Sequence, residues 1–165
     1  MKYSQGKTGR IFIVRLEDGE IIHKCIEELA AKENIRAAGV IILGGADKDS
    51  RLVVGPIKGR GAVIEPMELI LDDVYEITGT GTIFPDESGK AVLHLHAACG
   101  RKDKTHTGCV RRGVKVWHIG EVIIFEIFLT IQVPKMAAYN YKYILNVKLF
   151  SKFLRMFSNV LLVVS

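Results

Sequence analysis

The chain has 165 residues, of which 48% are hydrophobic and 25% are charged, so it is long enough for one domain with a buried core and too apolar to be disordered throughout. Its 16 Gly and 4 Pro follow no repeating triplet, which excludes collagen. Its 3 Cys are too few for a disulfide scaffold, which favours a cytoplasmic protein with reduced thiols. The net charge of +5 lies beyond residue 134, because residues 1–134 hold 18 basic and 18 acidic residues. This neutral body gives no electrostatic support for DNA binding.

The first predicted elements are a strand and the main helix. Residues 9–17 form a β-rich run, which predicts a strand. Asp18 and the acidic turn that follows predict the start of a helix over about 19–33, with Asn34 ending it. The apolar residues of this segment recur at the spacing of one helical face, and they are Ile22, Cys25, Ile26, Leu29 and Ala30.

Several short apolar runs then predict strands. Residues 37–43 are almost wholly apolar and predict a buried strand that ends in a Gly44-Gly45-Ala46 turn. Residues 52–54, 62–64 and 67–71 are candidate short strands between Gly- and Pro-containing turns.

The strongest strand signal comes next. Residues 74–84 alternate between Thr or Glu and mostly apolar or glycine positions, which is the period-two pattern of a strand. A turn at 85–89 and a strand at 91–98 complete a hairpin, a polar loop is expected over 100–108, and a long strand over 114–125. One helix among many strands predicts an α+β fold, with a mostly antiparallel sheet packed around that helix.

The C-terminal region does not continue this pattern of short strands and turns. We expect one domain over residues 1–127 and a divergent strand and amphipathic-helix extension over 128–165. Apolar residues recur every three or four positions between Tyr143 and Leu161, with three cations among them. Those cations argue against a transmembrane span and leave a core or oligomer helix, a membrane-surface helix or an unfolded tail as interpretations.

The pair His94 and His96 carries the main chemical signal. Residues i and i+2 of a strand point to the same face, so both imidazoles can bind one metal ion. The alternative is that both are ordinary surface or hydrogen-bonded histidines.

A third ligand would strengthen the metal interpretation. The candidates are Cys99, His106, Cys109 and His118. Cys109 follows a loop that lets the next segment return beside the His94 strand, whereas Cys99 has the opposite parity to His96 and Cys25 belongs to the apolar helix stripe. Two imidazoles and a thiolate favour zinc with an open fourth position; copper is less favoured because a His₂Cys copper site usually has an axial Met.

Several ordered motifs carry a resemblance to a known family. They are the stretches 9–20, 35–39, 43–46, 75–82, 94–97, 100–103 and 113–121. Together they resemble the plant- and prokaryote-conserved (PPC) domain, a domain of unknown function that is also labelled as DNA-binding, over about residues 8–127. The resemblance implies a strand-rich fold around one helix, a homotrimer, and a metal site in some members. Cys109 stands where the family pattern has its third histidine, so the implied ligands are His94, His96 and Cys109.

Three functions remain open at this point. The first is a homotrimeric zinc-binding module for interaction or regulation, with a protein partner or small-molecule ligand at the metal. The second is a metal-dependent hydrolase or lyase on a small polar substrate, with Glu76, Arg101 or Glu121 as candidate base or oxyanion partner. The third is a DNA-binding protein, which the neutral body disfavours.

Overall fold

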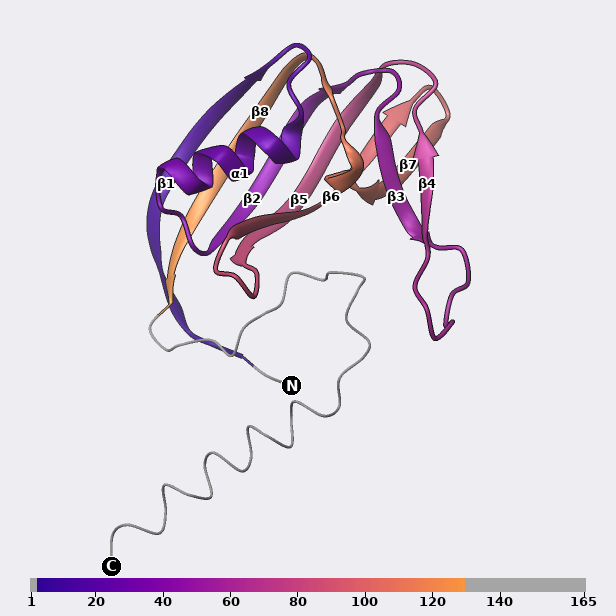
Figure 1. Ribbon diagram of the computed structural model, residues 1–165. Coiled ribbons are helices and arrows are strands. Elements are labelled where there is room, and N and C mark those ends of the chain that lie inside the picture. Colours follow the sequence, from indigo (N-terminus) through magenta and orange to yellow (C-terminus); the bar gives the residue numbers. More distant parts are fainter. Residues whose placement is uncertain (1–2, 130–165) are drawn as a thin grey trace, which may run out of the picture.

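The computed structural model describes residues 3–129 and contains one eight-stranded antiparallel sheet, one α-helix and a short 3₁₀ turn (Figure 1). The elements in chain order are β1 Gly6–Glu17, α1 Ile22–Lys32, β2 Ala38–Ala46, β3 Arg51–Pro56, β4 Pro66–Ile70, β5 Tyr75–Pro85, β6 Ala91–Arg101, β7 Lys104–Cys109, η1 Val110–Arg112 and β8 Val116–Leu129. The strand order across the sheet is β1-β8-β2-β5-β6-β7-β3-β4. The predicted α+β fold is therefore confirmed.

Helix α1 covers one face of the curved sheet and closes the hydrophobic core (Figure 1). Ile22, Ile26 and Ala30 of the predicted apolar stripe are fully buried, and they pack with alternate residues of the strands beneath. The helix begins later than expected because its N-cap is Ile21, while the Asp18 carboxylate accepts a hydrogen bond from the His118 backbone N–H at 2.6 Å. Asn34 follows the last turn with a φ of 55°, as a helix-ending residue does.

The opposite side of the sheet, here called the open face, is covered by no helix of residues 3–129. One row of register partners crosses six neighbouring strands on this face: Ile13, Ile123, Ile41, Thr80, His96 and Cys109. The first half of the open face is mostly apolar, and Ile13 is 86% exposed there. The second half begins with the threonines of β5 and ends at the two histidines and the cysteine. The period-two alternation thus separates a buried core from a chemically mixed surface.

Three strand predictions were wrong in detail. The predicted polar loop over 100–108 contains β7, which pairs with β6 through a tight turn at Lys102 and Asp103. The residues of β7 are mostly polar and do not alternate with apolar ones, so the strand is recognisable from its backbone pairing with β6 and not from a pattern of buried side chains. Residues 62–64 form no strand, and Gly44-Gly45 continues β2 instead of turning. A Cβ at Gly45 would lie 2.4 Å from the Trp117 carbonyl, so glycine here allows β8 to approach closely.

The extension predicted over 128–165, with its amphipathic helix, lies outside the described residues apart from the end of β8. Within residues 3–129, no helix has the length and apolar character that crossing a bilayer requires.

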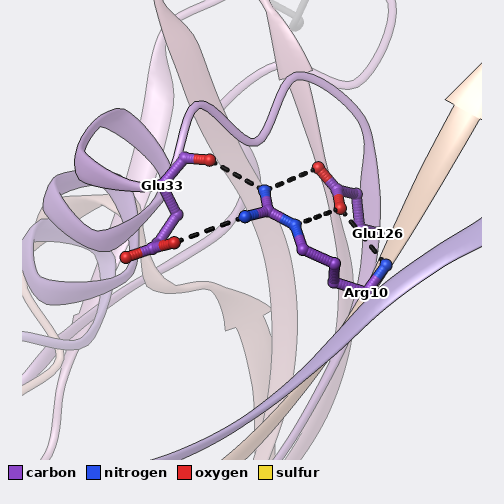
Figure 2. A network of polar contacts seen from close by, with 3 residues as sticks. All are labelled: Arg10, Glu33 and Glu126. Atoms are coloured by element: carbon purple, nitrogen blue, oxygen red, sulfur yellow. Dashed lines mark hydrogen bonds and ion pairs between the residues drawn. The ribbon is translucent and has the colours of Figure 1, made fainter.

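A charged cluster joins the first strand, the helix end and the last strand (Figure 2). The Arg10 guanidinium donates from Nε to Glu126 Oε2 at 2.7 Å and from Nη2 to Glu126 Oε1 at 3.0 Å. The same guanidinium donates to the Glu33 carbonyl at 2.8 Å and pairs with the Glu33 carboxylate. Because the Glu126 side chain is only 5% exposed, the arginine supplies the donors that a buried carboxylate needs.

We predict that Glu126→Gln lowers the thermal midpoint at pH 7 by several degrees. The hydrogen bonds from Arg10 hold the pKa of Glu126 below its usual value, so the pair stabilises the fold above the ordinary glutamate pKa and ceases to do so as pH falls through the lowered one. The midpoint difference between variant and wild type should therefore narrow on acidification below about pH 4. Thermal unfolding followed by circular dichroism across pH measures this.

Glu17→Gln is the matched control, because the Arg15–Glu17 pair is 65% and 63% exposed and should contribute little. Equal midpoints for the two variants at pH 7 would contradict the role assigned to Glu126.

Candidate metal centre

The centre is built by the pairing of β5, β6 and β7. In the antiparallel register Thr82 faces His94, Thr80 faces His96, and His96 faces Cys109 across the next strand. Register partners share a face, so both imidazoles and the thiol lie on the open face. Gly81 belongs to this arrangement, since a Cβ there would lie 2.5 Å from the His94 carbonyl and would force β6 away from β5.

The three side chains converge. One ligand atom from each of His94, His96 and Cys109 lies within 4.8 Å of the other two. The Nε2 atoms of the two histidines are 3.1 Å apart, with the rings nearly perpendicular at 83°. Cys109 is buried, His94 is half-buried and His96 is exposed, so the cluster opens toward solvent on the His96 side.

The surroundings favour neutral imidazole at His94. Burial lowers the pKa of His94, and the neighbouring His96 and the charge of Arg111 lower it further. A neutral ring nitrogen with a free lone pair is the form that binds a metal ion.

The other sequence candidates lie elsewhere. Cys99 is fully buried on the core face, where its register partner is His106, and the His106 ring packs against Tyr75 with centroids 5.9 Å apart. His118 is exposed on β8 and Cys25 is half-buried on α1. Among the described residues, only His94, His96 and Cys109 form a group of three or more potential ligands.

The proposed acid–base partners are also distant from the cluster. Glu76 pairs with Gly100, four residues beyond His96 along β6, which corresponds to roughly 13 Å. Glu121 lies on β8, three strand spacings from β6, or roughly 14 Å. Arg101 is committed to the Asp73 carboxylate and the Val74 carbonyl.

Sequence reasoning missed three polar residues beside the start of β6. Arg111 donates from Nη2 to the Leu93 carbonyl at 3.2 Å, and Glu27 accepts a hydrogen bond from the Leu93 N–H at 3.0 Å. His23 Nδ1 and Arg111 Nε are both buried and have no hydrogen-bond partner among the described residues. The position of Arg111, two residues after Cys109, is the signal that could have singled it out.

The donor set fits zinc. Zinc binds imidazole nitrogen at about 2.0–2.1 Å and thiolate sulfur at about 2.3 Å, so ligand atoms on one tetrahedral ion are separated by roughly 3.3–3.6 Å. The 3.1 Å between the two Nε2 atoms is close to that separation, and small side-chain rotations would bring the wider cluster to it. Two imidazoles and one thiolate leave a fourth position for an exchangeable ligand.

Comparison with known proteins gives a family and a fold. Residues 3–128 match the model of the Plants and Prokaryotes Conserved (PCC) domain. Among curated proteins none matches the chain. The fold is similar to that of a metal-containing protein from Archaeoglobus fulgidus, at 22% identity and a TM-score of 0.67, over 78% of this chain and 87% of that one.

Two further solved structures share the fold. A plant- and prokaryote-conserved protein from Pyrococcus horikoshii has 20% identity and a TM-score of 0.66, over 77% of this chain and 85% of that one. A protein from Bacteroides thetaiotaomicron, described as a proposed DNA-binding protein, has 17% identity and a TM-score of 0.59, over 73% and 83%.

We predict that Cys99 resists alkylation in the folded protein. Burial raises the pKa of Cys99 to about 11, and its side chain is 0% exposed, so neither the thiolate nor access to it is available near neutral pH. Iodoacetamide labelling at pH 7.5 followed by mass spectrometry should modify Cys25 in the native protein and Cys99 only after denaturation. If Cys99 is labelled as fast as Cys25 without denaturant, its assignment to the buried core face is wrong and it is again a candidate ligand.

Proposed function

The chain belongs to the Plants and Prokaryotes Conserved domain family, and from that premise we propose that it is a zinc-binding interaction or regulatory module that assembles as a homotrimer. The proposed ligands are His94, His96 and Cys109. The observation that carries the proposal is the convergence of their three ligand atoms within 4.8 Å on the open face of the sheet, where β6 pairs with β7.

The chemistry of the site agrees with a binding role. When bound, zinc would supply a positive, Lewis-acidic centre to which a small molecule or a side chain of a partner protein can coordinate. The two imidazoles come from one strand and the thiol from its paired neighbour, so the chain holds the donors together before metal arrives. All three cysteines are free thiols, which agrees with the reducing environment of the cytoplasm.

The open face supports self-association. Ile11, Ile13, Ile41 and Leu43 are between 41% and 86% exposed, and they come from strands β1 and β2 on either side of β8. A contiguous apolar surface of this kind on a single chain is typical of a protein–protein interface. A symmetric trimer that buries this face would leave the metal centre beside the contact.

Two other functions have narrower support. A metal-dependent hydrolase or lyase is favoured by the open coordination position, but the candidate bases Glu76 and Glu121 lie roughly 13–14 Å from the cluster by strand geometry. DNA binding is suggested by the description of the Bacteroides relative and is opposed by the balance of 18 basic and 18 acidic residues over 1–134.

We predict that the purified chain binds about one zinc ion per subunit, and that Cys109→Ser or His94→Ala weakens binding by ~100-fold or more. Loss of a residue that merely orients a ligand costs about 10–100-fold, so loss of a ligand itself should cost at least as much. Competition with a chromophoric chelator gives the affinity, and elemental analysis gives the stoichiometry.

Cys25→Ser and His118→Ala are matched controls, because they remove the same chemical groups at positions outside the cluster. Zinc affinity that is equal in Cys109→Ser and Cys25→Ser would overturn the metal assignment.

We predict that wild type is a trimer by light scattering and that Ile13→Glu shifts it toward monomers. The side chain is 86% exposed in the single chain, so a charge there should not unfold the subunit but would be buried without a partner in the assembly. Val63→Glu is the control, since Val63 is 81% exposed outside the sheet and should leave the trimer intact. A trimer that survives Ile13→Glu would place the interface elsewhere.

A further inference from the structure

We propose that the exchangeable position of the metal centre takes an oxyanion, meaning a carboxylate or phosphate group, and that Arg111 binds this anion beside the metal. This inference rests on the proposed zinc site at His94, His96 and Cys109 and names the class of ligand that the site accepts.

Arg111 lies next to the cluster through two connections. It follows Cys109 by two residues, at the point where β7 ends in η1. Its Nη2 donates to the carbonyl of Leu93 at 3.2 Å, and Leu93 directly precedes His94 on β6. The guanidinium is therefore anchored to the backbone of the residue that directly precedes the first imidazole.

The anchoring leaves donors of the guanidinium unused. Arg111 Nε is buried and has no hydrogen-bond partner among residues 3–129. Because Nε itself is closed to solvent, an oxyanion at the metal would accept from the outer Nη groups, and its negative charge would offset that of the guanidinium. A guanidinium also presents its N–H groups in a planar fork that matches the two oxygens of a carboxylate or phosphate.

The charge balance of the centre favours an anion over a neutral ligand. Zinc with one thiolate and two neutral imidazoles carries about one net positive charge, and Arg111 adds a second. The nearby acid is Glu27 on α1, but its Oε1 accepts from the Leu93 N–H at 3.0 Å and its Oε2 lies 3.8 Å from Lys90 Nζ. No Asp or Glu belongs to the ligand cluster in the described part of the chain.

Neighbouring hydroxyls complete the site. Thr80 and Thr82 of β5 are exposed register partners of His96 and His94 on the open face. Directly opposed residues of an antiparallel pair have Cβ atoms about 4.5–5.5 Å apart, so each threonine adjoins one of the two imidazoles and adds a hydroxyl group to the polar surroundings of the metal.

The test uses the full chain loaded with one equivalent of Co²⁺, whose visible absorption reports on its ligands. Acetate and inorganic phosphate are titrated separately, with imidazole as a neutral ligand. We expect acetate or phosphate to shift the spectrum of wild type and to bind roughly tenfold more weakly to Arg111→Gln, the size of a charge-assisted hydrogen bond. Imidazole should bind both proteins alike, and their cobalt affinities should agree within about twofold.

Arg112→Gln is the matched control, because Arg112 is the adjacent arginine and pairs with Glu68 at 3.0 Å. Arg111→Lys keeps the charge without the planar fork, so we expect about a threefold loss in anion affinity. If Arg111→Gln does not fold, the anion titrations are made with Arg111→Lys instead.

The outcomes separate the two proposals. Cobalt that fails to bind wild type overturns the metal site and this inference together. Cobalt that binds wild type, with acetate and phosphate affinities unchanged in Arg111→Gln or Arg111→Lys, overturns the anion inference alone. An equal loss in Arg112→Gln would likewise overturn it, because a general change in surface charge would then explain the effect.

Discussion

The antiparallel register between β5, β6 and β7 is the constraint on which the candidate site depends. It sets His96 opposite Cys109 and keeps both on the face that α1 leaves open. A slip of one residue would turn both histidines into the core and bring Leu95 and the other buried apolar residues of β6 to the surface. The same apolar burial that stabilises the fold therefore fixes the face on which these polar side chains lie.

The buried carboxylate of Glu126 is likewise placed by the alternation of β8 and needs a charged partner. Glu126 occupies an inward-facing position of β8, where a carboxylate is costly, and Arg10 from the neighbouring edge strand offsets that cost with hydrogen bonds from both its backbone and its guanidinium. Because Arg10 also binds Glu33 at the end of α1, one side chain joins the helix end to β1 and β8 (Figure 2). The apolar part of the open face spans β1, β8 and β2, so this cluster joins two of the three strands that carry the surface we propose for self-association.

Periodicity predicted the fold wherever burial controls the pattern. The helix stripe of Ile22, Ile26 and Ala30 and the alternation along β5 are direct consequences of one buried face, and both segments were located from sequence. Strand β7 could not be found in this way, since its residues are polar and its place is fixed by backbone pairing after a two-residue turn. The proximity of His94 and His96 follows from strand parity, whereas that of Cys109 depended on the return of a segment expected to be a loop. Arg111 was missed because its relation to the cluster passes through the Leu93 carbonyl, a backbone contact that no side-chain pattern encodes.

The resemblance to the family's motifs implies a third histidine where this chain has Cys109, and in the proposed centre a thiolate would change the charge as well as the donor atom. Three neutral imidazoles would leave a dication uncompensated, whereas a thiolate lowers the net charge by one. A centre of lower charge holds an anion less strongly, unless another cation stands beside it. Arg111 is such a cation, and it lies two residues from the substituted position on the same turn. In the proposed centre the cysteine and the arginine would act as a pair: the thiolate would bind the metal ion, and the guanidinium would restore the positive potential that an incoming oxyanion meets.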